Sequence, residues 1–318
     1  MLFATTSAMN HMPYWAWAGF LAFIVAMLAL DLGVFQRKHH TPTMKESLGW
    51  CAVWISLALV FNVIVWQTLG KQSGLEFLTG YLIELSLSVD NIFVFIVVFM
   101  FFKVPSQFQH RVLFWGIIGA AVMRFIFIFA GVRLLERFEW LIYGFGAFLI
   151  FTGIKMALPS AHNVDPSKNI AVRFFKKHFR VADTYDGNGR FFIRENGRLI
   201  ATPLFLVLLV IETTDLAFAV DSIPAVLAIT KEPFIVFTSN IFAILGLRSI
   251  YFALNGVMQP LRYLGLGLSI VLVFIGVKMI LSDIYHIDIT ISLLTIGGIL
   301  AATITASLLN PVKKDPNP

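Results

Sequence analysis

The stretch "FLTGYLIELSLSVDNIFVFIVVFMFF", residues 77–102, is an apolar run that carries two carboxylates and an amide near its middle, those of Glu84, Asp90 and Asn91. A charged side chain at the centre of a bilayer costs about 2.5–3.5 kcal/mol on insertion scales, and it marks a functional site by default. The stretch therefore predicts a transmembrane helix with a candidate site inside it.

Similar apolar runs recur along the whole chain. Of its 318 residues, 58% are hydrophobic and 13% are charged, whereas a soluble domain has about 25% charged residues. A run of roughly 20 apolar residues can cross a bilayer as a helix. We predict an all-α polytopic membrane bundle of about nine transmembrane helices, near residues 15–35, 48–69, 75–101, 112–134, 140–157, 202–229, 234–256, 262–281 and 289–309.

The distribution of positive charge predicts the orientation of the chain. Of the 24 Lys and Arg residues, sixteen lie in one set of alternate loops, four in the other set and four inside the spans. The positive-inside rule places the richer set in the cytoplasm. We therefore expect a multi-pass protein of a bacterial-type inner membrane, with its N-terminus outside and its C-terminus cytoplasmic.

The long connection 158–201 carries eight of the basic residues. Its segment "AVRFFKKHFRV", residues 171–181, predicts either an amphipathic helix on the anionic lipids of the inner leaflet or an ordinary cytosolic helix that caps the bundle. In "RFFIRENGRLIA", residues 190–201, the pair Asn196-Gly197 separates two apolar-rich arms, which predicts a β-hairpin.

The chain contains an internal repeat. Three segments recur in the same order: "SVDNIFVF" (88–95) and "AVDSIPAV" (219–226), "AAVMRFIFIF" (120–129) and "AILGLRSIYF" (243–252), and "LIFTGIKMAL" (149–158) and "LVFIGVKMIL" (272–281). The second match aligns Arg124 with Arg248. Each copy holds three spans, an odd number, so the copies have opposite orientations, as in many secondary transporters.

This repeat predicts the organisation of the whole chain. The predicted parts are two N-terminal transmembrane helices (1–74), a first three-helix repeat (75–157), the basic cytosolic connection (158–201), a second three-helix repeat (202–281), and a last transmembrane helix with a cytosolic tail (282–318).

Acidic residues occupy matching positions in the two repeats, since Glu84 aligns with Asp215 and Asp90 with Asp221. Oxygen-only sites suit Mg²⁺, Ca²⁺ and Mn²⁺. The predicted metal ligands are Glu84, Asp90, Asn91, Glu212, Asp215, Asp221 and Ser222, with Arg124 and Arg248 as charge partners. In the alternative interpretation, the acids and arginines are structural pairs that fix the register of the helices.

Helix geometry limits how these acids can share one ion. Glu84 and Asp90 are six residues apart, so they point about 120° apart on a straight helix. They converge on one ion only if the helix unwinds or if the other repeat completes the ligand set. Pro224, three residues after Asp221, removes a backbone donor and weakens the second helix near that point.

Several functional classes have no support in the sequence. The chain has no G-x-x-x-x-G-K-[ST] motif, and its spans show no nucleophile–base or metal-hydrolase pattern. We expect no enzyme activity, no organic cofactor and no nucleic-acid partner. The expected partners are a divalent cation as transported substrate, protons as coupling ion and anionic lipids; the sequence predicts no oligomeric state.

The sequence resembles the TerC family of membrane proteins, in particular its Alx-type members, over nearly the whole chain. The motifs that carry the resemblance are "FLTGYLIELSLSVDNIFVF", "TPLFLVLLVIETTDLAFAVDSIPAVLAIT", "PFIVFTSNIFAILGLRSIYF" and "FIGVKM". That family is similar to the wider LysE-type exporter superfamily. The resemblance implies efflux of Mn²⁺ from the cytoplasm through the acids named above.

Two other functions remain open beside Mn²⁺ export. One is a Ca²⁺/H⁺-type cation exchanger, and Mg²⁺ is a further possible substrate. The other is a membrane scaffold of a metal or tellurium stress-response complex, in which the acids are structural. Transport of a tellurium oxyanion does not follow, because an acidic site repels an anion.

Overall fold

The computed structural model describes residues 12–35, 43–138, 140–157, 169–195, 198–257, 263–285 and 287–310. The helices are α1 (Tyr14–Phe35), α2 (Met44–Leu69), α3 (Lys71–Phe101), α4 (Ser106–Arg137), α5 (Leu141–Ala157), α6 (Ile170–His178), α7 (Pro203–Leu227), α8 (Pro233–Val257), α9 (Leu264–Ile280) and α10 (Ile289–Leu309). The strands are β1 (Phe192–Glu195) and β2 (Arg198–Ala201).

The nine predicted spans are all helices in the structure, as α1–α5 and α7–α10. Among the described residues, α2, α4, α7, α8 and α10 are long and apolar enough to cross a membrane, and Tyr14–Ala29, α5 and α9 are shorter apolar helices. The prediction of a polytopic helical membrane protein is confirmed. The chain divides into two compact units, residues 1–41 with α1 and residues 42–318 with all other elements.

Several helix ends follow from local sequence. Thr43 and Glu46 form a reciprocal capping box at the start of α2. Gly70 alone joins α2 to α3 and has a φ of 93°, a conformation that glycine adopts without steric cost. Asp288 caps α10 by accepting a hydrogen bond of 2.7 Å from the Thr290 backbone N–H, which lowers the pKa of the Asp288 carboxyl.

The helix that carries the opening stretch is unbroken. α3 is helical from Lys71 to Phe101, including the segment from Glu84 to Asn91. α7 is also continuous, and Pro224 lies within its last turn. Of the two alternatives given above, unwinding of the helix near these acids is therefore not observed. Physically, Glu84 needs no freed backbone oxygens, because its partner comes from another helix.

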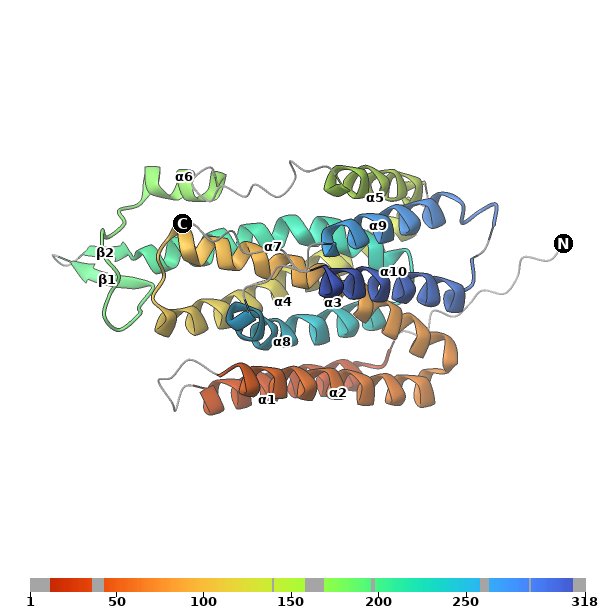
Figure 1. Cartoon of the computed structure of the whole chain (residues 1–318), viewed down its shortest axis with the longest axis horizontal. Coiled ribbons are helices and arrows are strands. Elements are labelled where there is room, and N and C mark those ends of the chain that lie inside the picture. The colour runs from red at the N-terminus through yellow and green to blue at the C-terminus, as the bar shows by residue number, and fades with distance from the viewer. Residues whose placement is uncertain are drawn as a thin grey trace. The chain divides into compact units, whose positions relative to one another are not determined.

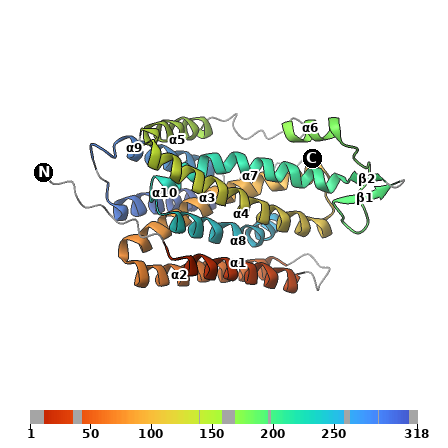
Figure 2. The ribbon, with the colours of Figure 1, turned by 180° about the vertical axis from the view of Figure 1, so that it is seen from behind.

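The contacts between helices follow the internal repeat. α3 packs against α8, and its counterpart α7 packs against α4, the counterpart of α8. Figure 1 shows α3, α7 and α8 in this bundle, and Figure 2 shows α4 beside α7 and α8. α5 and α9, the third helices of the two repeats, pack along each other. In the pairs α3–α8 and α7–α4, the first helix of one repeat packs against the second helix of the other repeat. Such reciprocal packing is expected when an approximate two-fold axis relates the repeats.

Backbone contact between α5 and α9 shows the same symmetry. A Cβ atom added to Gly146 would lie 2.8 Å from the Gly276 carbonyl oxygen, and one added to Gly153 would lie 2.7 Å from the Ser269 carbonyl oxygen. The repeat offset of 123 residues aligns Gly146 with Ser269 and Gly153 with Gly276. The two contacts therefore occupy equivalent positions in the two repeats. Small residues allow such close helix packing in membranes.

We expect Gly276→Ala to destabilise the folded protein by about 1–3 kcal/mol, the usual effect of overpacking. Its Cβ would lie 2.6 Å from the Gly146 carbonyl oxygen, so the helices must separate. Gly144→Ala is the matched control, because nothing lies within 4 Å of its Cβ and Ala favours a helix over Gly. Thermal unfolding in mild detergent measures both. An unchanged Gly276→Ala midpoint would argue against direct backbone contact.

The basic connection packs on the bundle through its apolar side chains. Val172 of α6 is 4% exposed, and the ring of Phe175 lies 5.0 Å from that of Phe205 on α7. The structure thus agrees with a helix that caps the bundle. β1 and β2 pair antiparallel, as expected for the predicted hairpin, although its turn at Asn196-Gly197 lies outside the described residues. The hairpin lies where α7 begins (Figure 1).

A hydrogen bond ties the connection to the end of α3. The Tyr185 hydroxyl donates to the Phe102 carbonyl oxygen at 2.7 Å. Burial raises the pKa of Tyr185 to about 12, so the hydroxyl keeps its proton and remains a donor at neutral pH.

Candidate cation site

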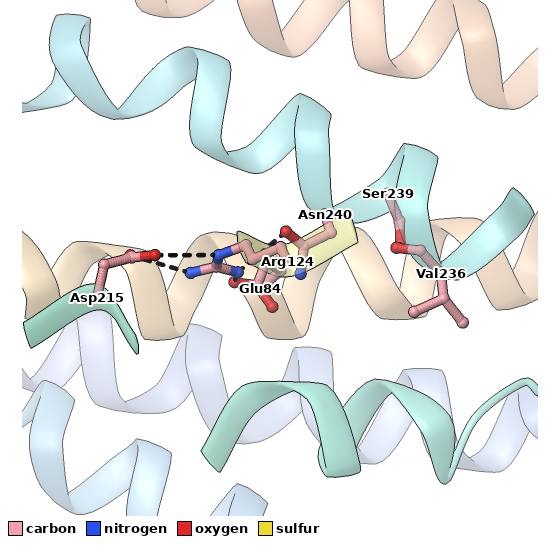
Figure 3. Close-up of polar contacts among 6 residues, drawn as sticks. All are labelled: Glu84, Arg124, Asp215, Val236, Ser239 and Asn240. Atoms are coloured by element: carbon pink, nitrogen blue, oxygen red, sulfur yellow. Dashed lines mark hydrogen bonds and ion pairs between the residues drawn. The ribbon is translucent and has the colours of Figure 1, made fainter. Parts of the chain in front are cut away.

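The site is built around Arg124, which lies on α4 and whose side chain is fully buried. Its guanidinium donates to both carboxylate oxygens of Asp215, from Nε to Oδ2 at 3.4 Å and from Nη2 to Oδ1 at 3.3 Å. Its Nη1 donates to Oε1 of Glu84 and, at 3.0 Å, to Oδ1 of Asn240. Figure 3 shows these side chains converging on the guanidinium.

Both repeats contribute to this cluster. Glu84 lies on α3 and Arg124 on α4, which belong to the first repeat, whereas Asp215 and Asn240 lie on α7 and α8 of the second. The Glu84 side chain is 0% exposed and that of Asp215 is 4% exposed. With both carboxylates ionised, the two acids and one arginine have a net charge of −1. Such a charge in a water-poor interior favours binding of a cation or a proton.

Several polar atoms of the bundle interior have no hydrogen-bond partner within the described part of the chain. They include Oε2 of Glu84, Nδ2 of Asn240, Oγ of Ser88 and Oγ of Ser222. A buried polar group without a partner costs free energy, and a bound water or ion commonly satisfies such a group. Those of Glu84, Ser88 and Ser222 are oxygens, which hard divalent cations prefer as ligands.

Glu212 has a different environment from the two acids that contact Arg124. It is one helical turn before Asp215 on α7, and its carboxylate lies against Gly119 of α4. A Cβ atom added to Gly119 would overlap with Oε1 of Glu212. The glycine therefore provides the space that the carboxylate occupies. Beside it, the Asn169 side-chain amide donates to the Thr213 hydroxyl at 2.9 Å.

Asp215 also borders a small internal cavity. Its volume is about 20 Å³, and its walls include Asp215, Arg248 and apolar side chains such as Phe95 and Ile244. This volume is enough for about one water molecule. Arg248, the second predicted charge partner, is 4% exposed. It lines the same cavity as Asp215 of the cluster.

The structure brings together part of the predicted ligand set. Glu84 and Asp215 meet at Arg124, whereas Asn91 and Ser222 are buried without a hydrogen bond to either acid in the chain as described. The side chains of Asp90 and Asp221 lie outside the described residues. No group of three acidic, histidine or cysteine side chains gathers as a metal site among those that are described. Metal binding stays a prediction.

Asn240 is a member of the cluster that the sequence analysis missed. It is 0% exposed and lies in the apolar helix α8. Its segment "TSNIF", residues 238–242, places an amide inside a membrane span, and buried amides commonly bond across membrane helices. That signal was present, but the internal repeat gave no acidic or basic counterpart to draw attention to it.

The sequence matches the model of the integral membrane protein TerC family over residues 69–315, which include the cluster and both repeats. The chain belongs to the TerC family. This confirms the resemblance described above, and it covers α3 to α10.

Relatives of this TerC-family chain cover nearly its full length. A Myxococcus xanthus protein described as the uncharacterized membrane protein STKORF319 is 55% identical over 293 residues, which is 92% of each chain. An Escherichia coli K12 protein, named as a candidate membrane-bound redox modulator Alx, is 49% identical over 90% of this chain and 92% of its own. A Salmonella typhi protein of the same name is 50% identical. No solved structure matches the chain.

Proposed function

We propose that this TerC-family protein is a secondary transporter that exports a divalent metal cation, Mn²⁺, from the cytoplasm. The observation that carries the proposal is the buried cluster in which Glu84, Arg124 and Asp215 meet from both repeats. Inverted-repeat transporters bind substrate near the midplane, between their repeats. The bundle is a multi-pass membrane protein with such a cluster.

Arg124 is proposed to act as a built-in counter-ion. Both oxygens of Asp215 accept hydrogen bonds from its guanidinium, so a metal cation and Arg124 compete for the same atoms. When the cation is absent, the arginine compensates the buried acids, which would otherwise destabilise the empty carrier. When the cation binds, Arg124 gives up at least part of its pairing. This exchange couples occupancy of the site to the packing of four helices.

The choice of Mn²⁺ rests on ligand chemistry and on the family. Carboxylate, amide and hydroxyl oxygens favour hard cations, among which Mn²⁺, Ca²⁺ and Mg²⁺ differ in coordination and cavity size. The positive charge of the connection and of alternate loops supports an inner-membrane orientation with the N-terminus outside and the C-terminus inside. Glu212, which forms no ion pair within the described part of the chain, is suited to carry protons in exchange.

The name of the Alx relatives is compatible with this function through the metal. The chain has a single cysteine, Cys51, so it cannot form an internal disulfide between two of its own thiols. A redox role by thiol–disulfide exchange within one chain is therefore disfavoured. Removal of a redox-active metal such as Mn²⁺ would alter cellular redox balance without any thiol chemistry in the protein.

A structural role for the acids is the second candidate function, as in a membrane scaffold. It is favoured by one observation, the pairing of Arg124 with Glu84, Asp215 and Asn240. The two functions differ in their prediction for neutral variants. A scaffold loses stability or assembly, whereas a transporter can lose flux while it stays folded.

The test is uptake of Mn²⁺ into inverted membrane vesicles, where export from the cytoplasm becomes uptake. We expect wild-type vesicles to accumulate Mn²⁺. The initial rate of uptake should be at least roughly tenfold lower in the Asp90→Asn and Asp221→Asn variants, because loss of supporting groups at a metal site lowers metal affinity or activity by about 10–100-fold. Asp186→Asn, in the cytosolic connection, is the control carboxylate. Unchanged flux in both membrane variants would exclude Asp90 and Asp221 from the transport site.

Competition in the same vesicles identifies the cation. An excess of Ca²⁺ or Mg²⁺ is expected to reduce Mn²⁺ uptake less than an equal excess of unlabelled Mn²⁺ does. Preferential inhibition by Ca²⁺ would instead identify the Ca²⁺/H⁺-type exchanger. Acidification inside the vesicles before uptake is expected to raise the rate if protons leave in exchange.

A further inference from the structure

A second, larger cavity lies away from the acidic cluster, where α6 and the β-hairpin meet the ends of α3 and α7. Its volume is about 940 Å³, within the range of sites that enclose an organic ligand. Phe102 follows the last residue of α3, and Pro203 begins α7, and both line the cavity. Both residues mark the limits of membrane-spanning helices, so the cavity lies at the level of the lipid headgroups.

Three cationic side chains line this cavity, those of Lys176, Arg180 and Arg198. Two carboxylates, Asp183 and Glu195, also line it. No ion pair joins these cations to either carboxylate within the chain that the structure describes. The cavity wall therefore has a net charge of +1, with cations that remain available to an anionic group.

The rest of the wall is apolar. Phe102, Phe179 and Leu206 contribute to it, and the Phe179 ring is 57% exposed. Exposed aromatic side chains at this level are typical of the membrane–water interface. A cationic region beside an apolar one, open at the interface, matches a molecule with a phosphate and acyl chains.

α6 itself does not lie free on the membrane. Its Val172 and Phe175 pack toward α7, and the side chain of its N-cap residue Asn169 is hydrogen-bonded to Thr213. Lys176 and Phe179 follow Val172 by four and seven residues, so they lie on the same face, at the end of α6 that borders the cavity.

We propose that this cavity is a binding site for one anionic phospholipid with a hydroxylated headgroup. Lys176, Arg180 and Arg198 bind its phosphate, and Asp183 and Glu195 accept hydrogen bonds from the headgroup hydroxyls. The first part of an acyl chain lies against Phe179 and Leu206. Basic pockets on the cytoplasmic side of membrane helices recognise anionic headgroups in this way. The site is independent of the proposed cation transport.

The test uses the purified full-length protein in detergent and phosphatidylglycerol as the probe. Native mass spectrometry measures the bound fraction, with phosphatidylcholine, phosphatidylethanolamine and inorganic phosphate as competitors. We expect saturable binding of phosphatidylglycerol that none of the three competitors displaces at equal concentration. Lys176→Gln and Arg180→Gln are each expected to weaken it roughly fivefold, the contribution of one basic residue near an anionic leaflet.

Arg173→Gln and Lys177→Gln are the matched controls. Both residues are exposed cations of α6 that do not line the cavity. They should retain the affinity of the wild type, and an unchanged thermal midpoint in all four variants shows that they are folded. Equal losses in all four variants would overturn the proposal in favour of a diffuse charge effect. Equal binding of phosphatidylethanolamine or of phosphate alone would also overturn it.

Discussion

Replacement of Arg124 by Gln is expected to lower the free energy of unfolding by about 3–5 kcal/mol, the effect of leaving buried charges without their partner. Arg124 is fully buried and donates to Glu84, Asp215 and Asn240. Without the guanidinium, two carboxylates remain in a water-poor interior. Unfolding of the purified protein by titration with a denaturing detergent measures the loss.

A double substitution separates charge from packing. Asp215→Asn in the Arg124→Gln background removes one of the two uncompensated charges, so we expect part of the stability to return. Lower pH should also reduce the loss in Arg124→Gln, because protonated carboxyls need no counter-ion. Strictly additive losses in the double variant would show that the ion pairs contribute little, and that the guanidinium acts mainly by filling space.

Replacement of Glu84 by Gln is expected to reduce Mn²⁺ uptake into inverted vesicles by roughly 100-fold or more. Truncating one member of a buried charge pair costs about 2–5 kcal/mol, and 2.7 kcal/mol corresponds to a factor of about 100. The substitution keeps the shape of the side chain. It removes the charge for which Arg124 and the cation are proposed to compete.

Glu76→Gln is the matched control for this prediction. It makes the same substitution in the same helix, at a side chain that contacts Gln72 and not the cluster. Its uptake should equal that of the wild type at equal protein amount. If Glu84→Gln transports as well as Glu76→Gln does, Glu84 is a structural acid.

The fold was largely predictable because membrane spans have a strong sequence signal. Apolar runs of about 20 residues identify the spans, and the repeated positions of Arg124 and Arg248 indicate the two repeats before any contact is known. The pairing of α5 with α9 needed the structure. Gly146 and Gly153 are recognised as interface residues only once the helices are packed.

The site was predictable in its residue types and less so in its geometry. The alignment of Glu84 with Asp215 indicated that acids from both repeats belong together, and the structure joins them through Arg124. The 120° separation of Glu84 and Asp90 left two alternatives open, unwinding of the helix or ligands from the other repeat, and α3 is not unwound. Sequence spacing describes one helix at a time, whereas the partners of Glu84 come from α4.

The contribution of Asn240 and the space left by Gly119 could not be derived from spacing either. Asn240 accepts a hydrogen bond from Arg124 at 3.0 Å, and Gly119 makes room for the carboxylate of Glu212. Both depend on how α4 packs against α7 and α8. Those crossings are set by side-chain packing across many positions, and no single motif encodes them.

The most direct test of the central claim is to measure the binding of Mn²⁺ to the purified protein through the electron paramagnetic resonance signal of the metal ion. The claim is that a cation and Arg124 compete for the carboxylates of Glu84 and Asp215. Wild-type protein is predicted to bind Mn²⁺ saturably through oxygen ligands, and Asp215→Asn, folded by the same thermal criterion, is predicted to bind it at least roughly tenfold more weakly. Equal Mn²⁺ affinity in the two proteins would contradict the claim.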